Sequence, residues 1–138
     1  ALVEAGAAVC DVLTEYQERE ANEASLRTQR VHASLPQYDY VLPYGDQADR
    51  VPHIACFGVA GVEAEAVVLG LDQAGVAVHS GSACSSESLE PSPVLEAMGV
   101  DARHSLRVSV GWSTTDEDID TFLAAFPAVV TRLKSLAT

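Results

Sequence analysis

Apolar side chains recur every three or four positions over residues 2–34, which is the spacing of a helix with one apolar face. The members of this stripe are Leu2, Val3, Val9, Val12, Leu13, Tyr16, Leu26 and Val31. A polar stretch at residues 17–23 marks an exposed part of the helix or a break in it. Pro36 has no amide donor and clashes with a preceding helical turn, so the helix is predicted to stop there.

Four short segments have the composition of β-strands and are bounded by turn residues. They are residues 38–42, 51–59, 76–78 and 106–110. Alternation is strongest in the last segment, where Leu106 and Val110 share one face and Arg107 lies on the other. The same rule places Cys56 and Phe57 on opposite faces of the second segment.

Three further segments predict helices. Residues 63–73 carry apolar side chains at helical spacing. Ser92 as N-cap and Pro93 at the first helical position begin a short helix. Thr114 and Glu117 have the spacing of a capping box before a last helix, which runs almost to the end of the chain. This order of elements predicts an α/β fold, with a single small sheet and helices packed on it.

Length and composition set the broad class. With 138 residues, of which 48% are hydrophobic, the chain is expected to fold as one domain with its own core. The net charge of −12 argues against binding to nucleic acid and to anionic membranes, because both would repel an acidic surface. No apolar run is long enough to span a bilayer.

The cysteines and the start of the chain add two expectations. Three cysteines at wide spacing do not form a disulfide framework, so we predict a reducing, cytoplasmic location. The first residues lack a basic leader and already have a helical pattern, which we interpret as part of a longer polypeptide.

The segment S-G-S-A-C-S-S at residues 80–86 contains a cysteine among small polar neighbours. The thiol of Cys84 is therefore predicted to be accessible and able to act as a nucleophile. Gly81 lets the backbone turn, and hydroxyl donors that could stabilise a thiolate or a persulfide come from Ser82, Ser85 and Ser86. Glu87 and Glu90 act against a thiolate because of their negative charge. On composition alone, a serine-rich surface loop with an incidental cysteine is an equal alternative.

Arg107 and His79 are the other candidates near this loop. A guanidinium on a rigid strand can hold a carboxylate in a bidentate fork, whereas the alternative for Arg107 is a surface ion pair with one of twenty acidic residues. His79 directly precedes the loop, where it either moves a proton near Cys84 or only ends a strand.

The remaining candidates are a metal-type spacing, one further cysteine and the tryptophan. His53 and Cys56 have a spacing seen in zinc sites, but a structural zinc site needs four ligands and no second pair exists at short spacing, so we predict no metal. Cys10 is expected to pack on the first helix, and Trp112 to anchor the last strand against the final helix.

Several of these segments resemble the cysteine desulfurases, which are pyridoxal-phosphate enzymes of the class V aminotransferase group. The loop motif, followed by L-E-P-S at residues 89–92, resembles the active-site loop of the subgroup with a longer, flexible cysteine loop. S-L-R-V-S-V-G at residues 105–111, followed by T-T-D-E-D-I-D at residues 114–120, resembles the strand and last helix of that family. The resemblance extends from about Val51 to the end of the chain.

The resemblance implies a reaction and its residues. Enzymes of this family take sulfur from L-cysteine, which yields L-alanine and a persulfide on the loop cysteine. Carried over by motif position, Cys84 is the nucleophile and persulfide carrier, and Arg107 holds the substrate carboxylate. The family also implies a sulfur acceptor, such as an iron–sulfur scaffold or a tRNA-thiolation relay, and a homodimer of the full-length parent.

The chain departs from the family in its cofactor site. The family's cofactor lysine lies in a preceding large domain, and the one lysine here, Lys134, is on the terminal helix. We therefore expect residues 1–138 to be the C-terminal small domain of a fold-type I pyridoxal-phosphate enzyme, without cofactor-binding residues and inactive when isolated. The alternatives are a non-catalytic persulfide-carrier or interaction module, and a class V aminotransferase acting on another amino acid.

Overall fold

Nine elements make up the part of the chain that the computed structural model describes, which is residues 2–46, 48–81 and 92–136. In chain order they are α1 (Leu2–Ser34), the 3-10 helix η1 (Leu35–Gln37), β1 (Val41–Pro43), β2 (Ile54–Val59), α2 (Ala64–Gln73), β3 (His79–Ser80), α3 (Pro93–Ala97), β4 (Ser105–Ser109) and α4 (Asp116–Leu136). The predicted end of the first helix before Pro36 is confirmed, because α1 stops at Ser34. Within these ranges, no helix is long and apolar enough to cross a membrane.

The strands form one four-stranded sheet in the order β1-β2-β4-β3, and every neighbouring pair is antiparallel. β4 is therefore an interior strand, paired with β2 on one side and with β3 on the other. Its register places Arg107 opposite Cys56 of β2 and opposite His79 of β3. The predicted α/β fold with a single small sheet is confirmed.

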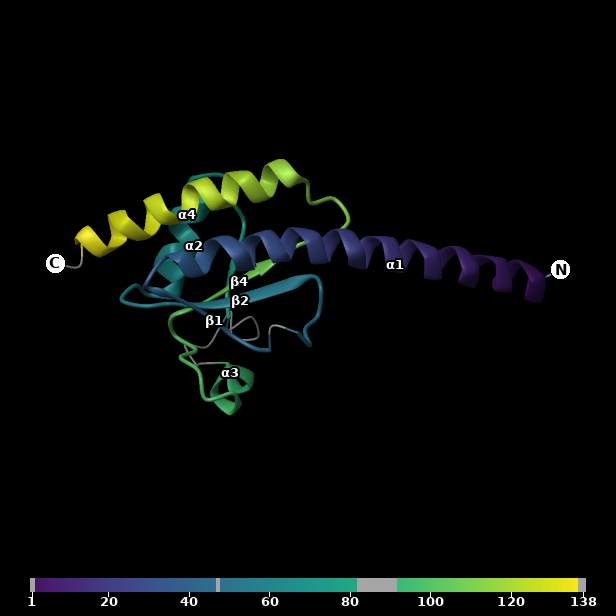
Figure 1. Cartoon of the computed structure of the whole chain (residues 1–138), viewed down its shortest axis with the longest axis horizontal. Helices are drawn as coiled ribbons and strands as arrows, with labels where there is room; N and C mark the ends of the chain where they lie inside the picture. The colour runs from purple at the N-terminus through teal and green to yellow at the C-terminus, as the bar shows by residue number, and fades with distance from the viewer. Residues whose placement is uncertain (1, 47, 82–91, 137–138) are drawn as a thin grey trace.

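Helices α1, α2 and α4 cover one face of the sheet, whereas α3 lies on the opposite side (Figure 1). α1 and α4 lie side by side and run in the same direction, and the N-terminal part of α1 extends beyond the sheet. Apolar side chains from the covering helices and from one face of the strands form the core. Its most deeply buried members include Val31, Leu35, Phe57, Val59, Val67, Leu71, Leu106, Phe126 and Val130.

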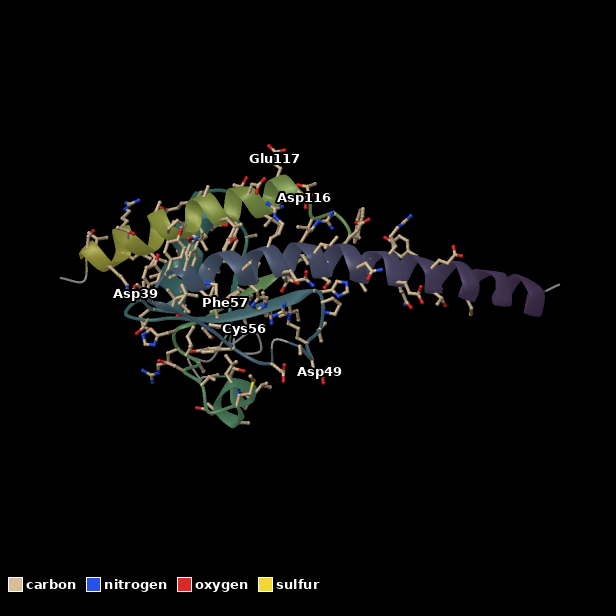
Figure 2. The ribbon with its side chains drawn as sticks, viewed as in Figure 1. Asp39, Asp49, Cys56, Phe57, Asp116 and Glu117 are labelled. Carbon is tan, nitrogen blue, oxygen red and sulfur yellow. The ribbon has the colours of Figure 1, made fainter. Side chains whose placement is uncertain are left out.

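Two arginines of α1 join this helix to the beginning of α4. The Nε of Arg27 lies 3.6 Å from a carboxylate oxygen of Asp116. Arg30 pairs with Asp116 at 3.5 Å and also with Asp120. Figure 2 shows Asp116 at the start of α4, on the side of α1. The carboxylates are well exposed, so each pair contributes at most about 1 kcal/mol, and apolar contact holds the two helices together.

The third predicted strand is displaced by the turn after α2. Residues 76–78 are not paired with β4, and β3 begins only at His79. The reason is that the amide of Val76 still donates a hydrogen bond to the Leu71 carbonyl oxygen at 2.9 Å, which keeps the chain at the end of α2. A hollow of about 280 Å³ remains between residues 76–78 and the second half of β4.

The capping box of the last helix is one residue further along than predicted. Thr115 Oγ1 accepts a hydrogen bond from the Asp118 amide at 3.2 Å, and the Asp118 carboxylate accepts one from the Thr115 amide at 2.7 Å. Thr114 instead accepts a hydrogen bond from the Gly111 amide at 2.9 Å and closes the preceding turn. The predicted pair with Glu117 is therefore wrong.

The packing roles predicted for Trp112 and Cys10 are also wrong. β4 ends at Ser109, so Trp112 lies in the turn beyond the strand, where its side chain is 76% exposed. Cys10 is an exposed free cysteine of α1.

Gly58 of β2 lies directly against the Tyr44 ring, because a Cβ atom at this position would be 2.3 Å from the Tyr44 hydroxyl oxygen. Tyr44 is buried and donates a hydrogen bond to the Asp101 carbonyl oxygen at 3.1 Å, so it is not free to move aside. We expect Gly58→Ala to lower the free energy of unfolding by about 1–3 kcal/mol, the usual cost of overfilling a packed site. The measurement is urea unfolding followed by far-ultraviolet circular dichroism. Gly111→Ala is the matched control, since nothing lies within 4 Å of its Cβ position; an equal loss in both variants would contradict the packing argument.

The ring of His32 in α1 is tilted against that of Phe57, with 4.9 Å between the ring centres, and neither ring nitrogen of His32 has a hydrogen-bond partner among the described residues. Burial, with a smaller contribution from the charge of Arg50, lowers the pKa of His32 from 6.5 to about 4. The unfolded chain binds this proton near pH 6.5 and the folded chain only near pH 4, so stability is expected to fall as the pH decreases through this interval. In His32→Leu the urea midpoint should fall less steeply over the same interval. Parallel pH profiles of the two proteins would rule out this role of His32.

Candidate functional site

The outer face of the sheet, which is the face opposite α1, α2 and α4, brings two of the predicted residues together. Arg107 lies in the middle of a cross-strand row, between Cys56 of β2 and His79 of β3. Side chains alternate along β4, so those of the two neighbours of Arg107 point into the core and that of Arg107 points to the outer face. The predicted opposite orientation of Cys56 and Phe57 is confirmed, since Phe57 belongs to the core and Cys56 packs on the outer side (Figure 2).

Arg107 is half-buried, and its Nε is a buried donor without a hydrogen-bond partner in the described ranges. In the same ranges no carboxylate forms an ion pair with it, so the alternative of a surface salt bridge finds no support there. A charged donor that is removed from water without a partner is costly. Its chemistry therefore suits an anionic group that binds in its fork, such as a carboxylate.

Cys56 is the thiol that the sheet brings close to Arg107. Burial raises the pKa of Cys56, and a hydrogen bond from the Phe57 amide and the charge of Arg107 act in the opposite direction without cancelling it. The thiol is therefore protonated at neutral pH and is a poor nucleophile. Its surroundings are apolar, with Tyr44 and Leu95 in the same cluster, and this packing role on the arginine side of the sheet was missed from the sequence.

His79 is exposed and lies at the edge strand of the row. Its Nδ1 donates a hydrogen bond to the carbonyl oxygen of Ser80, which leaves Nε2 as the remaining ring nitrogen. An open hollow of about 320 Å³ lies beside His79 and Ser80 and is bordered by Val68 and Leu69 of α2. His79 is thus the first residue of β3 and not the end of a strand, and it borders open space.

Gly81 is fixed by its contacts with β4 and α3. Its amide donates hydrogen bonds to the carbonyl oxygen and to Oγ of Ser105, both at 3.0 Å. A Cβ atom on Gly81 would lie 2.1 Å from Ser105 Oγ and 2.5 Å from Leu95 Cδ1. The glycine is therefore needed for a close approach to β4, and not only for the backbone freedom that the sequence suggested. Ser105 was missed as a site residue, although its position two residues before Arg107 on the same face was visible in the alternation.

The other predicted loop residues, Cys84, Ser82, Ser85 and Ser86, lie outside the described residues. The description resumes at Ser92, which is the extended N-cap of α3, and Pro93 takes the first helical position as predicted. His53 and Cys56, whose spacing is seen in zinc sites, lie in different surroundings. His53 Nε2 faces Glu20 at 3.9 Å, whereas Cys56 packs with the outer cluster. The described part of the chain contains no group of three metal-ligating side chains.

Comparisons with known proteins address the family. The model of the family "Aminotransferase class-V" matches residues 3–122, so the likeness also includes the first fifty residues, where the sequence suggested only a similar pattern. A cysteine desulfurase of Klebsiella pneumoniae is 34% identical over 133 residues, which are 94% of this chain and 34% of that protein. A cysteine desulfurase of Cereibacter sphaeroides is 41% identical over 96 residues, 67% of this chain and 25% of that protein. The chain thus spans about a quarter to a third of the length of these relatives.

Solved structures agree on the fold. A NifS-like protein from Rickettsia africae aligns with a TM-score of 0.69 at 24% identity, covering 82% of this chain and 29% of its own. A putative sugar aminotransferase from Streptococcus pneumoniae aligns with the same TM-score of 0.69 at 15% identity, covering 91% of this chain and 34% of its own. At these identities the structures show a shared fold and no more. The sequence matches show that this chain belongs to the class V aminotransferase family, among relatives that are cysteine desulfurases.

Proposed function

We propose that residues 1–138 are the C-terminal small domain of a cysteine desulfurase, which takes sulfur from L-cysteine and leaves L-alanine and a persulfide on Cys84. The observation that carries the proposal is the buried, unpartnered Nε of Arg107 on the same sheet face as the anchored residue Gly81. The names of the relatives support the choice of substrate and reaction.

The overall reaction balances with Cys84 as sulfur acceptor. The thiolate of Cys84 attacks the substrate sulfur and forms a new S–S bond, while the carbon–sulfur bond of the substrate breaks. The carbon that loses sulfur gains a proton, so L-cysteine becomes L-alanine and the thiol becomes a persulfide. Arg107 would bind the substrate carboxylate in a bidentate fork and hold the sulfur toward the loop.

The length of chain between Gly81 and Cys84 is compatible with this reaction. Three peptide links separate Gly81 from Cys84 and can span at most about 11 Å. Arg107 is two residues from Ser105, the residue that binds Gly81, which is roughly 7 Å along a strand. A thiol at position 84 can therefore approach a substrate whose carboxylate is held by Arg107.

The family's cofactor, pyridoxal phosphate, supplies the electron sink for breaking the carbon–sulfur bond in the full-length parent. The residues of this chain do not fit that cofactor. The one lysine, Lys134, is on α4, and its Nζ lies 4.1 Å from the centre of the Tyr40 ring, away from the outer face that carries Arg107. We therefore propose that cofactor binding resides in a large domain of the parent and that the chain alone does not desulfurate cysteine.

The same proposal includes the sulfur acceptor, the location and the oligomeric state of the full-length parent. The persulfide would pass to a sulfur-acceptor protein, such as an iron–sulfur scaffold, in the cytoplasm, and the parent would act as a homodimer. An accessible thiol that accepts sulfur and releases it to another thiol suits such transfer.

The nucleophile can be tested in the longer polypeptide with its cofactor bound and a thiol reductant present. Cys84→Ala is expected to abolish both sulfide release from L-cysteine and the added mass of one sulfur atom on the protein. Cys10→Ala, which changes an exposed cysteine of α1, should leave both unchanged. Sulfide release that survives in Cys84→Ala would contradict the role of Cys84, whereas transamination of another amino acid with no sulfide release from the unsubstituted protein would favour the aminotransferase. Sulfur uptake by the isolated chain from a separate active desulfurase, with no activity in any longer form, would favour the carrier module.

The carboxylate-binding role can be tested in the same polypeptide by Arg107→Lys. Lysine keeps the charge but loses the two-pronged geometry, so kcat/KM for L-cysteine should fall by about 10- to 100-fold, the loss expected for charged hydrogen bonds of about 1.5–3 kcal/mol. Arg103→Lys, an exposed position on the preceding loop, is the control and should behave as the unsubstituted enzyme. Steady-state kinetics measure the effect, and equal values for both variants would remove Arg107 from substrate binding.

A further inference from the structure

Ser105 has a hydroxyl group in a place where a polar side chain is expensive. It is 0% exposed, and among the described residues it shares the class of buried polar side chains only with Thr28. Its Oγ donates a hydrogen bond to the Ala102 carbonyl oxygen at 2.7 Å and accepts one from the Gly81 amide at 3.0 Å. A buried hydroxyl is tolerated when it is hydrogen-bonded in this way. The side chain therefore connects the turn before β4 to the end of β3.

Three elements meet at this hydroxyl. Gly81 follows β3, Ser105 begins β4, and Leu95 of α3 completes the contact, since its Cδ1 lies 2.5 Å from the position of a Cβ on Gly81. Gly81 is the last described residue before the segment 82–91, and Leu95 lies on the first turn of the helix that follows it. Gly81 and α3 are thus packed against each other and against Ser105.

β4 also fixes the distance from this contact at Ser105 to Arg107. Ser105 and Arg107 are two residues apart on β4 and share its outer face. β4 is paired on both sides over this stretch, with Gly58 and Cys56 of β2 and with the residues of β3. A strand that is paired on both sides has little freedom to bend, so the contact at Ser105 and the guanidinium of Arg107 stay at a constant distance from each other.

We propose that Ser105 is a positioning residue, whose hydroxyl fixes Gly81, the residue directly before the segment 82–91, relative to Arg107. This inference rests on the proposed function, in which the segment carries the attacking thiol and Arg107 holds the substrate. Ser105 touches neither substrate nor sulfur. It acts through Gly81, and its loss changes the alignment of thiol and substrate while the carboxylate site remains intact.

The anchoring can be tested on the chain itself, without cofactor or substrate. In Ser105→Ala the Gly81 amide keeps its bond to the backbone carbonyl but loses the one to Oγ, so its hydrogen–deuterium exchange should become about 3- to 10-fold faster, as for loss of one hydrogen bond. Ser109→Ala is the matched control, because Ser109 is an exposed serine on the same face of the same strand. Gly81→Ala is the second variant and should also speed exchange in this stretch, since its methyl group displaces Ser105 Oγ. Exchange at Gly81 that is equal in Ser105→Ala and Ser109→Ala would overturn the anchoring.

Alignment is tested in the longer polypeptide with cofactor bound. A positioning role predicts that Ser105→Ala lowers kcat per active site for sulfur transfer about tenfold, with an unchanged KM for L-cysteine. Ser109→Ala should alter neither constant. A merely structural role would lower the melting temperature and the active fraction without this split, and a rise in KM equal to the fall in kcat would place Ser105 in substrate binding; either result overturns the proposal.

The failure of the proposed function gives a different result. In that case the unsubstituted parent transfers no sulfur to Cys84, which refutes the desulfurase assignment and with it the positioning role. Accelerated exchange at Gly81 in Ser105→Ala would then show an anchor without a catalytic purpose.

Discussion

The register of β4 between β2 and β3 is the constraint on which the rest of the structure depends. Side chains alternate across a strand, so a slip by one residue would exchange the two faces completely. Arg107 would then enter the core in place of Leu106, which is fully buried beneath the helices. Burying a guanidinium without a partner costs several kcal/mol, so the apolar core and the position of the arginine enforce each other.

The two faces of the sheet differ in how they are packed. The helical face is filled by large apolar side chains, whereas the outer face carries a small cluster of Tyr44, Leu95 and Ala102 beside polar groups. This small cluster packs α3 against the outer face and leaves the Arg107 donor without a partner in the described ranges. A rigid sheet that presents one charged group beside the anchored Gly81 provides the fixed geometry that a binding site requires.

Local sequence patterns predicted much of this structure. The features that they missed depend on contacts between residues far apart in the sequence. The end of α1 followed from the geometry of Pro36, and the outward orientation of Arg107 followed from strict alternation in its segment. The alignment of Cys56 and His79 with Arg107 depends on strand pairing between distant segments, which no local pattern encodes. The role of Gly81 as a close-packed residue required knowing that Ser105 lies against it. The displaced capping box reflects competition, because Thr114 was already engaged by the turn.

The exposed position of Trp112 has a consequence for the optical properties of this protein. It is the one tryptophan of the chain, and its indole is already in contact with water in the native state. Its fluorescence emission is therefore already at the long wavelength of a water-exposed indole before denaturant is added, and unfolding changes this wavelength little. The same indole is instead a sensitive reporter of any molecule that covers the turn between β4 and α4, since such a contact would shift its emission to shorter wavelength.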